Sequence, residues 1–148
     1  MKEPIEPPER GEMHDALAVF LGEWRAEGWS YGGPSRETWT SRHTARWHTG
    51  EFFLIQDERA RTPDPFDTLS VLGVSPDSGR YFAQTYENHG FFRLYDVVRD
   101  GDLWTFTGAT ERARIEFGDG GRKQTINWEW LKDGAWLPLC DRTATKES

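Results

Sequence analysis

From Glu23 onward the sequence alternates apolar and polar residues in short runs, and turn residues interrupt these runs at close intervals. Successive side chains of a strand point to opposite faces, so runs of period two predict β-strands. The Gly, Pro, Asn and Asp residues between them mark tight turns. We expect about ten strands, at residues 23–31, 36–48, 51–60, 66–74, 80–88, 91–99, 102–108, 110–117, 122–131 and 135–145.

The connections between these strands are mostly short hairpins. Sequential hairpins favour an up-and-down order, because a Greek key needs one long return connection. An open sheet of ten strands would expose two edges, and closure removes them. The sequence therefore predicts an all-β fold, a closed antiparallel up-and-down β-barrel of about ten strands, whose interior has room for one small ligand.

One short helix is expected before the barrel, over residues 12–21. Apolar residues recur there at spacings of three and four, at Met13, Leu17, Phe20 and Leu21. Gly22 follows in the place of a C-cap glycine. Residues 1–11, rich in Pro and Glu, are expected to form a flexible tail, and residues 12–148 a single barrel domain.

Charge and cysteine content limit the partners and the compartment. The chain has 25 acidic and 18 basic side chains, a net charge of -7, and no basic run of five residues. Nucleic acid and membrane surfaces repel such a chain, so we expect neither as a partner. Cys140 is the sole cysteine and excludes an intrachain disulfide. With no signal-peptide pattern at the N-terminus, we expect a cytoplasmic protein.

The segment from Leu17 to Gly28 reads Leu-Ala-Val-Phe-Leu-Gly-Glu-Trp-Arg-Ala-Glu-Gly. A helix that runs into Gly-x-Trp resembles the entry motif of lipocalins and other calycins, and especially of the nitrobindin subgroup. The resemblance implies that Trp24 plugs one end of the barrel. The runs Leu-Gly-Val-Ser-Pro-Asp-Ser-Gly-Arg-Tyr (72–81) and Leu-Trp-Thr-Phe-Thr-Gly (103–108) resemble a family of small uncharacterised bacterial calycin-like proteins. Calycins carry lipids, retinoids, tetrapyrroles or haem, and some are enzymes.

The resemblance to nitrobindins implies haem held by a histidine on a late strand. The four histidines are His14, His43, His48 and His89, so residues 90–148 contain none. Cys140 lies in about the right region, but its thiol would have to be deprotonated to serve as a ligand. We therefore expect no haem and no other cofactor or metal.

The second predicted strand carries the first candidate site residues. Trp39, His43 and Trp47 share one face with small residues, and the opposite face carries only Thr and Arg. The Trp and His face is therefore expected to look inward. His43 can contact a ligand or act as an acid or base near neutral pH. The alternative is a histidine satisfied by a neighbouring carboxylate or by the backbone.

The third strand and the last two strands add further candidates. Gln56 and Glu58 share a face and would form a polar pair beside His43 if they look inward, or a solvated rim if they do not. Trp128 lies on one face with Ile126 and Trp130, and these tryptophans are expected to complete the core, or to form an aromatic wall if they face a cavity. On the last strand, four residues are expected to share a face: Trp136, Pro138, Cys140 and Arg142.

The two strands in the middle of the chain offer an aromatic pocket with polar groups. Gln84 and Tyr86 share a face of one strand, and Arg93 and Tyr95 share a face of the next. All four are expected to line the interior, where a few polar groups orient a ligand. Arg93 can bind a ligand carboxylate, or pair with a protein carboxylate, at Glu58 or Glu87.

No known catalytic motif is readable in the chain, neither a Gly-x-Ser-x-Gly elbow nor a phosphate loop. The fold and the aromatic content predict a protein that binds a small apolar or aromatic molecule in the barrel. The alternative is a cofactor-free isomerase, cyclase or hydrolase that uses His43 with Glu58 or Tyr95. The sequence is also compatible with a homodimer.

Overall fold

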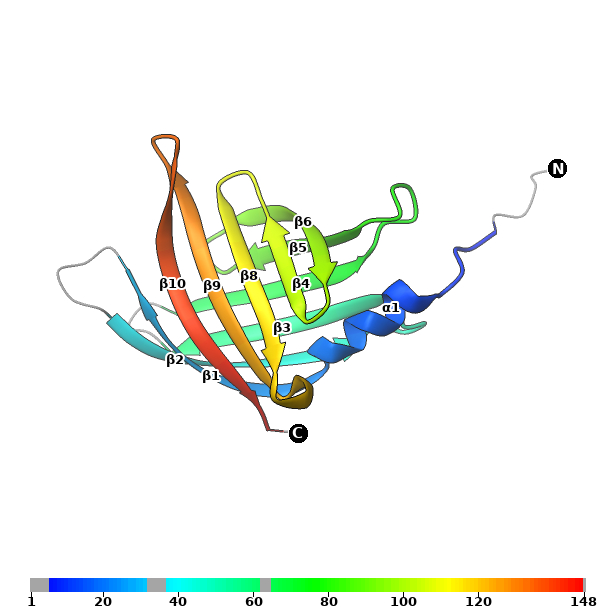
Figure 1. The fold of residues 1–148 in the computed structure, drawn as a ribbon, viewed down its shortest axis with the longest axis horizontal. Helices are drawn as coiled ribbons and strands as arrows, with labels where there is room; N and C mark the ends of the chain where they lie inside the picture. Colours follow the sequence, from blue (N-terminus) through cyan, green and yellow to red (C-terminus); the bar gives the residue numbers. More distant parts are fainter. Residues whose placement is uncertain (1–5, 32–36, 62–64, 148) are drawn as a thin grey trace.

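A computed structural model describes residues 6–31, 37–61 and 65–147. It confirms the predicted fold, a closed antiparallel barrel of ten strands in which each strand pairs with the next and β1 pairs with β10 (Figure 1). The strands are β1 (Gly22–Ser30), β2 (Glu37–Trp47), β3 (Phe53–Arg61), β4 (Phe66–Val74), β5 (Tyr81–Glu87), β6 (Phe92–Asp100), β7 (Leu103–Thr107), β8 (Glu111–Gly118), β9 (Lys123–Lys132) and β10 (Ala135–Lys146). None of the helices described is long and apolar enough to cross a membrane.

The N-terminal helix is shorter than expected. It consists of an α-helical turn, α1 (Glu12–Ala16), and a 3₁₀ turn, η1 (Leu17–Phe20). Leu21 is already extended, and Gly22 begins β1 with a φ of 127° instead of capping the helix. Glycine tolerates this backbone conformation because it has no Cβ. The tight turn therefore comes one residue earlier than predicted and leads directly into the strand.

The helical segment closes one end of the barrel. Figure 1 shows it beside the turn between β8 and β9, while the β9–β10 hairpin lies at the opposite end. Phe20 is 2% exposed, and its ring meets Trp104 and Phe117 edge-on at 5.0 Å each. The Trp24 indole donates a hydrogen bond to the Phe20 carbonyl at 3.0 Å. Trp24 thus lies under the helical segment, as the calycin resemblance implies.

Strand register determines which side chains face the interior. Trp24 of β1 lies opposite His43 of β2, and His43 lies opposite Glu58 of β3. The same row continues to Thr68 of β4 and Glu87 of β5. Because Trp24 is fully buried in the core, the whole row faces inward. This row marks the change from the apolar end of the barrel to a polar one.

The hydrogen-bonded ladder between β9 and β10 departs from simple alternation. β10 contains a bulge between Pro138 and Cys140, so residues on either side of it change faces. Cys140 and Arg142 face inward with Trp128 and Ile126, whereas Trp136 and Pro138 face outward. The expectation that these four residues share a face is therefore wrong, because the bulge inserts one extra residue into the strand.

Candidate functional site

The half of the interior away from the helical segment is polar and admits solvent. The side chains of Glu58, Arg93 and Glu111 face inward, yet they are 15%, 24% and 21% exposed. Gln56 also faces inward and is half-buried. The helix end, in contrast, holds large side chains that are less than 2% exposed, among them Trp24, Trp104 and Leu54. A ligand entering the barrel would therefore meet the polar half.

A buried ion pair crosses this half of the barrel. Arg142 of β10 pairs with Glu58 of β3, and its Nη1 lies 3.4 Å from the Ser41 hydroxyl of β2. The guanidinium reaches over β1 because the inward residues of that strand are small, Ala26 and Gly28. Burial lowers the pKa of Arg142 to about 10, so the side chain remains charged at neutral pH.

His43 lies beside this ion pair and is 2% exposed. Neither of its ring nitrogens has a hydrogen-bond partner among the residues that the structure describes. Burial, and then the charge of Arg142, lower the pKa of His43 to about 3. The imidazole is therefore neutral at physiological pH and carries one unused donor and one unused acceptor. The carboxylate or backbone partner that the sequence left open is not present in the described part.

A second polar cluster lies across β6, β8 and β9. Arg93 pairs with Glu111 at 3.0 Å, and the Tyr95 hydroxyl donates to the same carboxylate at 3.3 Å. Arg93 therefore pairs with neither Glu58 nor Glu87. The Trp128 ring meets Tyr95 edge-on at 5.6 Å. This cluster forms one wall of the polar half, with an aromatic surface beside a satisfied charge pair.

Burial suppresses the acid chemistry of two groups in this wall. Burial is the main reason why the pKa of Tyr95 is raised, and burial also raises the pKa of Cys140 to about 12. The phenol and the thiol therefore both stay protonated at neutral pH. Cys140 is a poor nucleophile under these conditions, because the thiolate is the reactive form.

The two other predicted tryptophans lie at opposite ends of β2. Trp39 is half-buried at the open end, where its indole donates to the Ser30 hydroxyl at 3.0 Å. Trp47 lies at the helix end, with the Arg10 guanidinium 5.2 Å from its ring centroid. Trp39 thus belongs to the polar half together with His43, whereas Trp47 packs against the core and is separate from it.

The placement of Gln84 and Tyr86 inside the barrel is wrong. Both lie on the outer face of β5, where the Tyr86 hydroxyl donates to Gln84 at 3.1 Å and Tyr86 is 43% exposed. The register places Thr85 opposite the inward Arg93, so the inward face of β5 carries Ala83, Thr85 and Glu87. The aromatic face of this strand was expected to be buried, but on β5 it is the face exposed to solvent.

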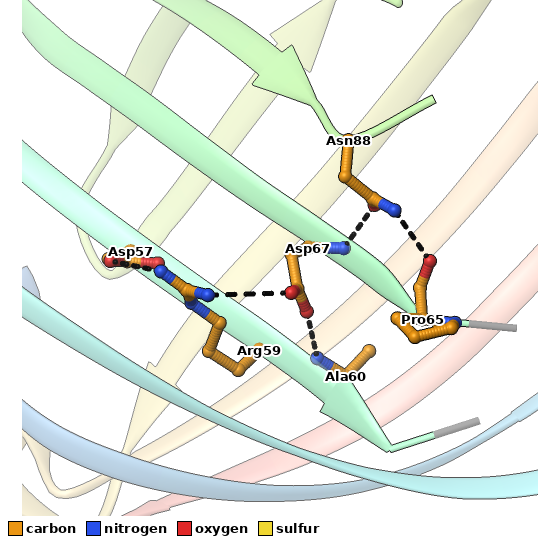
Figure 2. A network of polar contacts seen from close by, with 6 residues as sticks. All are labelled: Asp57, Arg59, Ala60, Pro65, Asp67 and Asn88. Atoms are coloured by element: carbon orange, nitrogen blue, oxygen red, sulfur yellow. Dashed lines mark hydrogen bonds and ion pairs between the residues drawn. The ribbon is translucent and has the colours of Figure 1, made fainter. Parts of the chain in front are cut away.

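A polar network fixes the rim next to Glu58 (Figure 2). Asp67 of β4 accepts a hydrogen bond from the Ala60 amide at 3.3 Å and forms an ion pair with Arg59 at 3.5 Å. Asn88 accepts from the Asp67 amide at 2.7 Å and donates to the Pro65 carbonyl at 2.9 Å. The network joins β3, β4 and the turn after β5, and so holds the strand that carries Glu58 in place.

Sequence reasoning missed Arg142 and Glu111 as partners in the site. Arg142 was placed on a strand face, but without its pairing to Glu58, which is distant in sequence. Glu111 shares its strand face with Ala113, Ile115 and Phe117, and this alternation indicated that it looks inward. Arg142 alternates in the same way with Cys140 and Ala144, but neither pattern shows the ion-pair partner.

The arrangement is suited to binding rather than to acid–base catalysis. A general base works best with a pKa near the operating pH, and that of His43 is far below it. No group of three or more His, Cys, Asp or Glu side chains within the described ranges could hold a metal ion. What the site offers is aromatic surface, paired charges and unused neutral hydrogen-bonding groups.

Sequence comparison assigns the chain to a family. Residues 9–117 match the family described as "Protein of unknown function (DUF1579)". The chain belongs to the DUF1579 family. The matched segment includes His43, Glu58 and Arg93, whereas Arg142 lies beyond it. Among curated proteins none matches the sequence.

Two solved structures share the fold. Rv2717c from M. tuberculosis superimposes with a TM-score of 0.71 at 13% identity, over 95% of this chain and 100% of that one. The S-type phycobiliprotein lyase CPES from Guillardia theta superimposes with a TM-score of 0.54 at 12% identity, over 94% of each chain. At these identities the likeness concerns the fold alone. It fits the calycin-like, lipocalin-like barrel that the sequence motifs indicated.

Proposed function

We propose that this member of the DUF1579 family binds a small, uncharged aromatic molecule that carries a hydrogen-bonding group. The ligand lies in the polar half of the barrel, between Trp39 and the Trp128–Tyr95 wall. The observation that carries the proposal is the unpartnered, neutral His43 beside charges that are already paired.

Stability alone does not account for such an interior. Replacing a buried ion pair by apolar residues of similar size is often neutral or stabilising. A buried imidazole without partners costs on the order of 1–3 kcal/mol for each unsatisfied group. The chain nevertheless places His43 and the Arg142–Glu58 pair together in the interior. A ligand that uses these groups explains their presence.

The balance of charges narrows the ligand class. Within the described residues, Arg142 pairs with Glu58 and Arg93 with Glu111, and the Glu87 carboxylate accepts a hydrogen bond from the His89 amide. A charged ligand would bring a charge without a partner into a low-dielectric interior, which is costly. Arg93 is therefore not free to bind a ligand carboxylate.

We keep the cytoplasm as the proposed location, because a chain with a single cysteine forms no intrachain disulfide.

An enzymatic role is the weaker candidate. One structural neighbour is named a phycobiliprotein lyase, which leaves a catalytic use of such barrels open. In this chain, however, His43 is a very weak base and the Tyr95 and Cys140 groups stay protonated. These residues support ligand binding better than proton transfer.

The proposal is tested with three probes that share one ring system and differ in charge: indole, indole-3-acetate and tryptamine. Isothermal titration calorimetry is expected to give saturable binding that is strongest for neutral indole. Trp128→Leu is expected to weaken it, whereas Trp136→Leu, a matched change on the outer face of the same hairpin, is not. Equal or tighter binding of the charged probes would contradict the ligand class, and no saturable binding of any probe would contradict the proposal.

A further inference from the structure

The outer wall of the barrel over β4, β5 and β6 is apolar and exposed. Five large apolar side chains on this wall are between 43% and 57% exposed: Leu69, Tyr86, Phe92, Leu94 and Val98. The register makes Leu69, Tyr86 and Phe92 direct neighbours across the three strands. We call these five residues the apolar outer wall.

The rest of the barrel exterior provides the comparison. The outward residues of β2 are all Thr or Arg: Thr38, Thr40, Arg42, Thr44 and Arg46. Those of β9 are mostly Lys, Thr, Asn and Glu. A chain with a net charge of -7 thus gathers its most exposed large apolar side chains around β4, β5 and β6, while the β9–β10 hairpin carries a smaller group, Trp130, Leu131 and Leu137. Contiguous exposed apolar patches of this kind mark interaction surfaces.

A groove of about 770 Å³ lies on the same side of the barrel. Phe53, Phe82 and Leu94 line it, and the rings of Phe53 and Phe82 are 6.2 Å apart. Gly73 lies under these rings, and a Cβ there would be 2.5 Å from Phe53. The missing side chain at Gly73 leaves room for the two rings, whose planes are 59° apart. Leu94 lines the groove and also belongs to the apolar outer wall, so the groove borders the ridge that the Tyr86 and Phe92 rings, 5.3 Å apart, form.

We propose that the apolar outer wall is the interface of a homodimer. The ridge and the groove lie side by side on one face, so a two-fold axis in the plane of contact places the ridge of each copy in the groove of the other. Two-fold contacts are self-complementary in this way. The charges that border the groove, Arg80 and Asp96, form a pair and sum to zero. Two acidic copies can therefore meet at this groove without opposing like charges.

The apolar outer wall supplies about half of the area that a stable dimer buries on each partner. A large aromatic side chain removes ~150–250 Å² from water when it is covered. Five large apolar side chains that are about half exposed leave roughly 400 Å² to cover, before the groove walls are added. A stable interface buries ~800 Å² on each partner, with an apolar, aromatic centre and a polar rim. The wall has this composition.

The test is the mass of the full-length protein in solution over a wide concentration range, by sedimentation velocity and light scattering. We expect a dimer that dissociates on dilution. Leu94→Asp and Phe92→Asp each place a charge in the contact and are expected to weaken dimerisation by roughly tenfold or more. Circular dichroism and thermal melting confirm that each variant is folded.

Thr125→Asp, at an exposed position on the outer face of β9, adds the same charge to the polar side and is expected to leave the dimer unchanged. A wild-type chain that stays monomeric at the highest concentration would overturn the proposal. So would a dimer that Leu94→Asp and Phe92→Asp leave as strong as before. Neither result depends on whether the barrel interior binds a ligand.

Discussion

The imidazole of His43 stacks on the indole of Trp24, with ring centroids 5.9 Å apart and planes 11° from parallel. The stack holds a polar ring at the boundary between the apolar plug and the polar half of the barrel. Glu58 from β3 and Arg142 from β10 form an ion pair on the polar side of His43, and the Lys146 ammonium lies 5.9 Å from the Trp24 ring centroid. His43 is thus fixed in position but free to hydrogen-bond.

We expect the protein to become less stable as the pH is lowered, over a pH range that the two pKa values of His43 determine. Its pKa is about 3 in the folded protein and ~6.5 in an unfolded chain. The unfolded state therefore binds more protons below pH ~6.5, and the contribution of neutral His43 is lost as the pH falls towards 3. We expect a loss on the order of 1 kcal/mol per pH unit below pH ~6, measured by urea unfolding.

His43→Leu is expected to flatten this pH dependence, and His48→Gln, at an exposed position, is expected to leave it unchanged. At neutral pH we expect His43→Leu to be folded and about as stable as the wild type, because it removes two unsatisfied nitrogens. It should nevertheless bind the neutral indole probe more weakly. An unchanged pH profile in His43→Leu would show that another group governs the window.

Arg142→Met is expected to destabilise the protein by about 3 kcal/mol or more, because it leaves the Glu58 carboxylate without its buried partner. Glu58→Leu alone is expected to have a similar effect, because it leaves the Arg142 guanidinium without its buried partner. The double variant is expected to recover most of the loss, since both charges are then gone. Denaturant unfolding of the four proteins in a double-mutant cycle measures the coupling. Additive losses would mean that the two side chains do not interact.

Gly28→Ala is expected to destabilise the barrel by about 1–3 kcal/mol. A Cβ at this position would lie 2.6 Å from the Asp141 carbonyl oxygen, 2.8 Å from the Arg142 Cβ and 3.0 Å from the Trp39 ring. Gly118→Ala is the matched control, because Gly118 has an extended backbone and nothing within 4 Å of its Cβ position. Thermal melting compares the two. Equal stability of both variants would show that the wall gives way around residue 28.

The strands could be predicted from the sequence because alternation and turn residues are local. For β2 the inward face was also predictable, since the opposite face carries only Thr and Arg. Alternation shows which residues share a face, however, and not which face is buried. On β5 the aromatic face points outward, so the expectation for Gln84 and Tyr86 is wrong. An aromatic face that points to solvent reverses the usual signal.

The pairings inside the barrel could not be predicted for a different reason. Arg142 meets Glu58 only because closure brings β10 next to β1 and small residues on β1 leave a path. Register and closure are properties of the whole sheet and leave no mark on a single strand. The bulge near Cys140 likewise changes the face of Trp136 without a local sequence signal.

Haem is the cofactor that the resemblance to nitrobindins suggests. The histidines do not fit this group. His43 lies on β2 rather than on a late strand and stacks on Trp24, His14 accepts a hydrogen bond from the Gly11 amide, and His89 pairs with Glu87 at the rim. Cys140 stays protonated because burial raises its pKa to about 12. An axial ligand for iron would have to come from one of these groups or from the exposed His48.

We therefore expect that haemin added to the purified protein gives no sharp Soret band at a one-to-one ratio. Absorption titration measures this directly, with a protein of known haem affinity as the positive control. A stoichiometric complex that His43→Leu abolishes would mean that Trp24 and His43 separate to admit iron. In that case the polar half of the barrel would serve a cofactor, and the neutral aromatic ligand proposed above would have to be abandoned.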